Sequence, residues 1–184
     1  LIGNYGNFIN RVLTLTHRIK SDNEGNPLLL YERLDDYDNL ITEIRKLHTK
    51  ATISLERQRF KESLRHIMAI SQKGNALLQQ CAPWKYLNSE ENEEKNKSLS
   101  GLALAWRIAR SLAVLTRPFM PFQSDRLWKM LGEVTLIDDI LWQDAIKFNS
   151  KMTWVDTIPA PLFKKLDLNE ILQREDTIAK KYNN

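Results

Sequence analysis

A stripe of polar side chains near the start of the sequence has residue types that can bind a nucleic acid. In the stretch GNYGNFINRVLTLTHRI, the spacing of Asn4, Asn7, Arg11 and Arg18 places them along one side of a helix. An asparagine amide offers two donors and an acceptor, and an arginine offers five donors, so Asn7 and Arg11 together could read the edge of an unstacked base. On residue types alone, a solvated helix face is the preferred interpretation of this stripe.

A second candidate is the tryptophan in CAPWKY, residues 81–86. Pro83 has no N–H and disfavours a helical conformation in the residue before it, so we expect the helix containing Cys81 to end there. Trp84 then lies just past a helix end, where Pro83 would stiffen it as a platform for a stacked base. Such stacking is worth roughly 1–3 kcal/mol. The alternative, which residue types alone favour, is a ring folded back over the bundle end; Trp106 and Trp128 are predicted to be core residues.

Signatures of catalysis and of metal binding are missing from the sequence. It has no GxGxxG, GxxxxGK[ST], HExxH or GxSxG motif. The histidines at 17, 48 and 66 fall on different predicted helices with no nearby cysteine partner, which argues against a zinc site. The single cysteine, Cys81, is predicted to be a buried and unreactive side chain. The chain is therefore expected to bind rather than to catalyse, with no catalytic residue, metal ligand or cofactor site of its own.

The composition is that of a soluble globular domain, with 184 residues, 42% hydrophobic and 27% charged. No apolar run approaches the roughly 18 residues that span a bilayer, so no membrane partner is expected. The absence of an initiator methionine suggests a processed product or an excised fragment. A net charge of +4 permits an anionic partner without requiring one.

Apolar residues recur at helical spacing through most of the chain. We predict an all-α bundle of five or six helices in one domain, residues 1–184. The second helix should begin near Asp35 or Asp36, a suitable N-cap, and Pro121 suits the first turn of a helix that ends at Gly132. Residues 133–184 are expected to form a less regular C-terminal extension, with an irregular stretch that includes a short strand over 133–165 and with a final helix. The other predicted helices cover residues 1–20, 59–81, 92–117 and 167–182.

Four short motifs together resemble one protein family. GNFINRV lies near the start, a helix ends with Asn75 and PWK, RPFMPF occupies 117–122, and PLFKKLD occupies 161–167. In this order and at these separations they resemble the anticodon-binding domain of methionyl-tRNA synthetase, a class I aminoacyl-tRNA synthetase. Each motif is weak alone, but the resemblance covers nearly the whole chain.

The resemblance implies binding of tRNA(Met) through its CAU anticodon. In the family, an asparagine and an arginine four residues apart on the first helix act together with the tryptophan of the PW motif, which stacks on the first anticodon base. These positions fall on Asn7, Arg11 and Trp84, with Pro83 as the adjacent proline. This replaces both of the interpretations that residue types alone favoured. Candidates for contacts with the tRNA backbone are Asn4, Arg18, Lys85 and, from charge only, the arginines at 107–117.

The resemblance also implies what this chain lacks. The HIGH-like and KMSKS motifs and the zinc-binding cysteines of the family are absent, so the catalytic domain is expected to be missing, and with it the ATP, Mg and Zn sites. The chain would be an inactive part of a cytoplasmic ligase that attaches methionine to its tRNA at the expense of ATP, with that catalytic domain as a partner. Two alternatives stay open: the anticodon-binding domain of another class I synthetase, and a helical protein-interaction module with an apolar surface groove.

Overall fold

The computed structural model describes residues 2–22, 35–86, 92–150, 152–153, 160–163, 169, 171–175 and 178. Over these ranges the chain consists of helices, turns and irregular segments, with no strand, which confirms the all-α prediction. The α-helices are α1 (Asn7–Asp22), α2 (Asp38–Glu56), α3 (Phe60–Cys81), α4 (Pro83–Tyr86), α5 (Asn92–Thr116) and α6 (Pro121–Met130).

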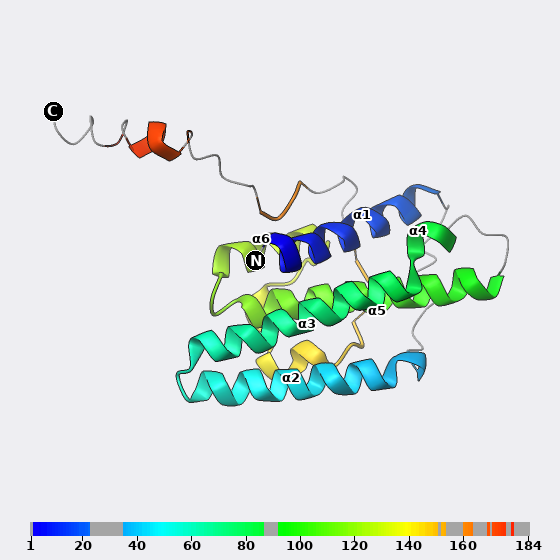
Figure 1. Cartoon of the computed structure of the whole chain (residues 1–184), viewed down its shortest axis with the longest axis horizontal. Coiled ribbons are helices and arrows are strands. Elements are labelled where there is room, and N and C mark those ends of the chain that lie inside the picture. The colour runs from blue at the N-terminus through cyan, green and yellow to red at the C-terminus, as the bar shows by residue number, and fades with distance from the viewer. Residues whose placement is uncertain are drawn as a thin grey trace.

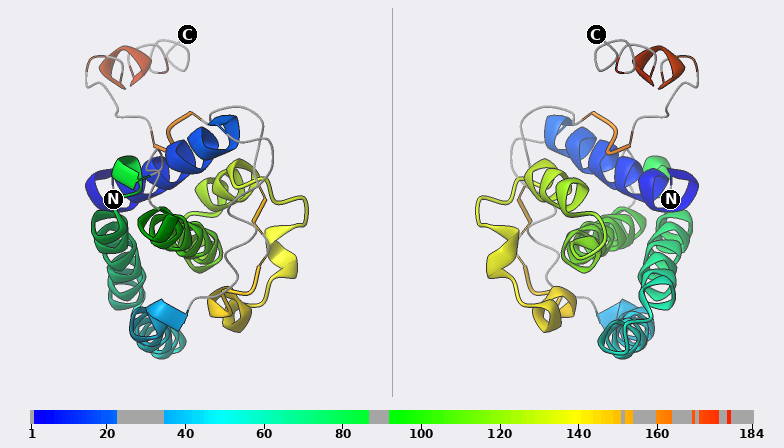
Figure 2. Two further views of the ribbon diagram at one scale, coloured as in Figure 1. Left: turned by 90° about the vertical axis from the view of Figure 1, so that its right-hand side faces the viewer. Right: turned by 90° about the vertical axis from the view of Figure 1, so that its left-hand side faces the viewer.

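Helix α5 forms the centre of the bundle because it is apolar on nearly all sides. Every residue from 98 to 116 except Arg110 is buried. Helices α1, α3 and α6 pack around α5, and α2 lies at the periphery against α3 (Figures 1 and 2). By length and composition alone α5 could cross a membrane, but 94% of its apolar window is buried inside the bundle. A helix that is hydrophobic all round is expected at such a central position.

Helix α1 is amphipathic, and its buried face fixes the direction of its polar face. Phe8, Ile9 and Val12 are fully buried, and the Phe8 ring fits closely against Gly74 of α3, where an added Cβ would come within 2.5 Å of the ring. A π-helical turn, Ile2–Gly6, precedes α1. The continuous α-helix predicted from residue 1 is therefore wrong for its first turn.

The start of α2 differs from the prediction by two or three residues. A 3₁₀ turn, Asp35–Tyr37, leads into the helix at Asp38, and no side chain caps this end. The expected cap at Asp35 or Asp36 was therefore wrong. Asp35 and Asp36 lie inside the turn instead, because a tighter 3₁₀ turn can precede an α-helix and satisfy part of its unpaired backbone.

The chain after α5 turns back over the bundle through α6 and two 3₁₀ turns, Ile137–Asp139 and Trp142–Ile146. Pro121 opens α6 as predicted, and Gly132 follows its end with a positive φ of 81°. Residues 133–150 are irregular as expected, and the strand suggested there is absent from the described part. The predicted helix over 167–182 lies mostly outside the described residues, although 171–175 are helical.

One glycine is required by the packing of α5 against the end of α3. A Cβ on Gly101 would lie 2.7 Å from Cys81 Cβ and 3.0 Å from the Tyr37 hydroxyl oxygen. Gly101→Ala should therefore lower the free energy of unfolding by about 1–3 kcal/mol, the usual cost of overpacking, as measured by urea denaturation. Gly3→Ala is the matched control, because a Cβ on Gly3 meets no atom within 4 Å. Equal stabilities of the two variants would contradict this account.

Candidate nucleic-acid interface

A sharp elbow between α3 and α4 places Trp84. Helix α3 ends at Cys81, and Ala82 takes a left-handed conformation with φ 37° and ψ 56°. Pro83 then opens the four-residue helix α4, which carries Trp84. Pro83 was expected to stop α3 and does follow its end; it also starts a new helix, because its fixed φ suits a first helical position. Pro83 is buried, whereas Trp84 is 39% exposed.

Helix α5 packs against this elbow and stabilises it. The Ser98 hydroxyl donates a hydrogen bond of 2.7 Å to the backbone carbonyl of Cys81, and the absence of a side chain at Gly101 lets α3 approach closely. Left-handed backbone in a residue other than glycine costs about 1–2 kcal/mol and persists only where its surroundings enforce it. The Cys81 thiol is buried beneath the elbow, and burial raises its pKa to about 11. This confirms that Cys81 is buried and agrees with the expectation that it is unreactive.

Arg11 and Trp84 are in direct contact, although 73 positions separate them in the chain. The Arg11 guanidinium carbon lies 5.0 Å from the centroid of the Trp84 ring, which is a cation–π arrangement worth about 0.5–1 kcal/mol at an exposed site. Arg11 comes from α1 and Trp84 from α4, so the contact joins two elements on the outside of α5. The stripe and the PW motif therefore form a single surface.

Asn7 is the first residue of α1 and lies one turn before Arg11 on the exposed side of the helix. Its amide nitrogen donates a hydrogen bond of 3.1 Å to the Gly3 carbonyl. In the part of the chain that the structure describes, this is the only hydrogen bond of the side chain. The amide oxygen and one N–H thus remain exposed beside Arg11.

Asn4 has a structural role within the described residues. Its amide nitrogen donates to the Met68 carbonyl at 3.2 Å, and its amide oxygen accepts hydrogen bonds from Ser71 and Asn75. Asn75 also donates to the Asn4 backbone carbonyl. These bonds tie the π-helical turn to α3, so the predicted backbone contact of Asn4 would have to use its one remaining amide N–H.

The two basic candidates for backbone contacts, Lys85 and Arg18, lie on α4 and α1. Lys85 is exposed and follows Trp84 directly in α4. Arg18 is exposed on α1, seven residues and therefore about 10 Å further along the helix than Arg11. The roles of both residues stay predictions.

Two arginines of α5 serve the fold, which corrects the prediction that the arginines at 107–117 contact phosphates. Arg107 is 5% exposed and donates to the Ser150 carbonyl at 3.3 Å. Arg110 forms an ion pair with Glu133 and lies 4.5 Å above the Trp128 ring. The sequence showed the basic charges, but the residues that pair with them come from a later segment of the chain.

Arg117 is also paired within the fold. It forms ion pairs with Asp125 of α6 at 2.8 Å and with Asp138 at 2.7 Å. Its hydrogen bonds to Asp138 hold the pKa of that carboxyl below its usual value. The charge of Arg117 is thus paired within the fold, and a phosphate contact of this residue would have to displace one of these two carboxylates.

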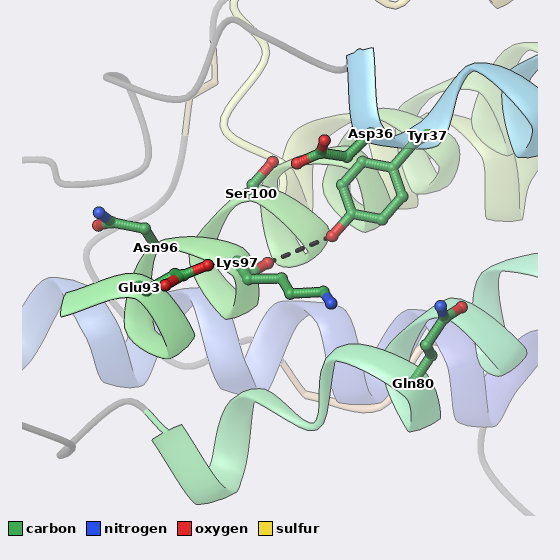
Figure 3. Close-up of a pocket in the computed structure, with 7 residues that line it drawn as sticks. All are labelled: Asp36, Tyr37, Gln80, Glu93, Asn96, Lys97 and Ser100. Atoms are coloured by element: carbon green, nitrogen blue, oxygen red, sulfur yellow. Dashed lines mark hydrogen bonds between the residues drawn. The ribbon is translucent and has the colours of Figure 1, made fainter. Parts of the chain in front are cut away.

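A surface pocket of about 620 Å³ lies at the end of the bundle where α3 and α5 meet the 3₁₀ turn before α2 (Figure 3). The Tyr37 hydroxyl donates to the Lys97 carbonyl at 3.2 Å across it. Two carboxylates and one ammonium line the pocket, so its charge does not suit a phosphate. The lining residues are Asp36, Tyr37, Gln80, Glu93, Asn96, Lys97 and Ser100.

Sequence reasoning missed the parts of the elbow that come from α5, Ser98 and Gly101. A glycine within a long apolar helix is costly and commonly marks a close approach of backbone. That signal was present at Gly101. The hydrogen bond from Ser98 had no comparable signal, because its partner is a backbone carbonyl on another helix.

A comparison with protein-family models matches residues 32–180 to the anticodon-binding domain of methionyl-tRNA ligase. The chain belongs to this family. The match includes Trp84 and decides against both alternatives that the sequence left open, another class I synthetase and a protein-interaction module. Helix α1 lies before the matched range, so the roles of Asn7 and Arg11 stay predictions.

Relatives of this anticodon-binding domain are similar over almost the whole chain. A methionine–tRNA ligase of Methanopyrus kandleri is 30% identical over 90% of the chain, and one of Aeropyrum pernix is 32% identical over 95%. The chain spans only 23% and 29% of these two proteins. It therefore corresponds to about a quarter of the relatives it matches.

Solved structures show the same fold. The apo form of Mycobacterium tuberculosis methionyl-tRNA synthetase superposes with a TM-score of 0.76 at 18% identity, over 91% of this chain and 32% of that one. The complex of that enzyme with methionyl-adenylate gives a TM-score of 0.73 at 19% identity, over 90% and 31% of the two chains. The bundle of this anticodon-binding domain is thus preserved where little of the sequence is.

Proposed function

We propose that this domain binds tRNA(Met) by recognising the CAU anticodon in a splayed anticodon loop. The contact between Arg11 and Trp84 carries the proposal, because it brings a stacking surface and a base-reading side chain to one exposed place. Asn7 extends the same surface by one helical turn. A stacking ring beside hydrogen-bonding side chains is the usual means of recognising unstacked RNA bases.

The three side chains divide the recognition of the first anticodon base between them. The base stacks on the exposed part of the Trp84 ring, while the guanidinium of Arg11 covers the ring from its own side. Cytosine presents an amino group as a donor, which the free amide oxygen of Asn7 accepts. Arg11 has only donors, so it serves the acceptor atoms of the base or a neighbouring phosphate.

We further propose that the domain works as part of a methionine–tRNA ligase, which attaches methionine to tRNA in an ATP-dependent reaction. The names of the relatives support this, since the chain matches about a quarter of each. The catalytic domain, with its ATP, Mg and Zn sites, would belong to another part of the same protein. We propose that this ligase is located in the cytoplasm, where proteins are synthesised.

The test is a comparison of two RNAs on the 184-residue chain. A stem-loop carrying CAU should bind at least tenfold more tightly than one with a changed first anticodon base, in titrations at one fixed salt concentration. Arg11→Ala should reduce both the affinity and this ratio, because it removes donors that face the base. Lys129→Ala, which changes an exposed cation of α6 outside this surface, is the control for loss of charge alone. Equal affinity for the two RNAs would overturn the proposal.

A further inference from the structure

The hairpin between α2 and α3 is strongly basic, a property that the proposed anticodon site does not use. Residues 45–65 contain seven basic and two acidic residues, a net charge of +5. Since the whole chain carries +4, all other residues together amount to −1. We call the exposed cations near this turn the basic tip: Lys50, Arg57, Arg59, Lys61 and Arg65.

The cations of the basic tip are available to a partner. Lys50, Arg57, Lys61 and Arg65 are exposed and make no ion pair with another described residue. Arg59 has a single partner, Glu62 at 3.6 Å, and both of these side chains are largely exposed. Exposed pairs of this kind are weak and readily exchanged. The tip therefore presents four exposed cations without an ion pair among the described residues, and Glu56 and Glu62 are the acidic side chains of the same hairpin.

The basic tip and the anticodon site lie at opposite ends of α3. The tip is at the start of α3, and α4 with Trp84 follows its end (Figure 1). Twenty-two residues of α3 separate them, a distance of about 33 Å. A compact anticodon loop bound at Trp84 does not extend over this distance, whereas a duplex stem that continues from the loop can do so.

Fewer exposed cations lie near Trp84 than at the basic tip, so most of the electrostatic attraction for an RNA is expected from the tip. Arg11 and Lys85 lie beside the ring and Arg18 about 10 Å further along α1, while the pocket between α3 and α5 holds the carboxylates of Asp36 and Glu93 against the one ammonium of Lys97. Phosphate contacts supply most of the sequence-independent affinity of proteins for nucleic acids. We infer that the basic tip binds the phosphate backbone of the duplex stem of the same RNA whose loop occupies the anticodon site, an inference that rests on the proposed function.

The chemistry of the basic tip favours RNA over an acidic protein. A stable protein interface has an apolar centre surrounded by a polar rim. Around the tip only Phe60 and Ile53 are exposed apolar side chains, at 57% and 42%. Cations spaced along two helices and the turn between them match a repeating row of phosphates better than they match such a centre.

Stem length and salt test the inference directly. An RNA duplex is A-form and rises less per base pair than the roughly 3.4 Å of B-DNA. A CAU stem-loop closed by three pairs therefore extends less than about 10 Å, too short to reach the tip, whereas one closed by sixteen pairs is long enough to span the distance. The neutral variant carries K50Q, R57Q, K61Q and R65Q. The control carries K50R, R57K, K61R and R65K, which keeps every charge. All four positions are exposed, so both variants should fold, which a melting curve verifies.

The wild type and the control should bind the long stem-loop more tightly than the short one, and the neutral variant should lose this gain. Four phosphate contacts give a slope of about −3.6 in log affinity against log salt. Doubling the salt should then weaken binding of the long RNA about tenfold more in the wild type than in the neutral variant. Equal salt slopes would overturn the inference and would point to an acidic protein as the partner of the tip.

The same titrations separate this inference from the proposed function. If the tip has no effect but the short stem-loop still prefers CAU, the inference fails and the proposed function stands. If the preference for CAU is absent while the effects of stem length and charge persist, the tip binds duplex RNA and the anticodon proposal fails.

Discussion

Trp84→Ala should lower the affinity for the CAU stem-loop by about 5- to 150-fold, because stacking of a base on an aromatic ring is worth about 1–3 kcal/mol. The preference for the correct first anticodon base should decrease as well, because that base loses the surface that orients it. Trp84→Phe keeps an aromatic face and should retain much of the affinity. Equilibrium titrations with the CAU stem-loop and the one with a changed first base measure the affinities of the wild type and of both variants.

The melting temperature decides between this role and a packing role for Trp84. The Trp84 ring is 39% exposed, whereas its neighbour Pro83 is buried. Trp84→Ala should therefore change the melting temperature far less than Trp106→Ala, which removes a fully buried ring. A large drop in melting temperature with unchanged RNA binding would show that Trp84 is a core residue.

Glu133→Ala should lower the free energy of unfolding by about 3–5 kcal/mol. The side chains of Glu133 and Arg110 are only 11% and 13% exposed, so removal of the carboxylate leaves a charge that is both desolvated and unpaired. The double variant Arg110→Met and Glu133→Leu should recover most of this loss, because the Arg110 side chain already lies against the Trp128 ring. Urea denaturation of the three proteins measures the difference.

The matched control for this pair is the exposed ion pair between Glu43 and Lys73. Their nitrogen and oxygen atoms are 2.6 Å apart, but both side chains are about half exposed. Glu43→Ala should therefore change stability little. If Glu133→Ala had as small an effect, burial would not be what makes the Arg110 pair important.

Sequence patterns predicted the longer helices because each of them is amphipathic or apolar over several turns, whereas the single turn of α4 has no such pattern and was not predicted. Helix α5 shows this well: its run of apolar residues marks it as the centre of the bundle, and Trp106 is buried there as predicted. Trp128 is buried as predicted too. The starts of α1 and α2 were less predictable, because a π-helical turn and a 3₁₀ turn leave no distinct spacing in the sequence.

The candidate site was only partly predictable for a different reason. The spacing of Asn7 and Arg11 follows from one helix, but the contact of Arg11 with Trp84 depends on how α1 and α4 pack against α5. The same limit explains the error at Arg110, whose partner Glu133 lies 23 residues later in the chain. Charge and periodicity show which residues are available, and packing determines which of them are already paired.

The left-handed elbow at Ala82 also affects how an RNA can meet this surface. The backbone, the Ser98 hydrogen bond and the buried Pro83 fix the direction of α4 in the free chain. Ordering a side chain or loop on association ordinarily costs about 0.5–1.5 kcal/mol for each group that becomes immobilised. Since the elbow is already ordered in the free chain, Trp84 is preorganised for binding. Most of the conformational entropy lost on binding is then lost by the flexible RNA loop.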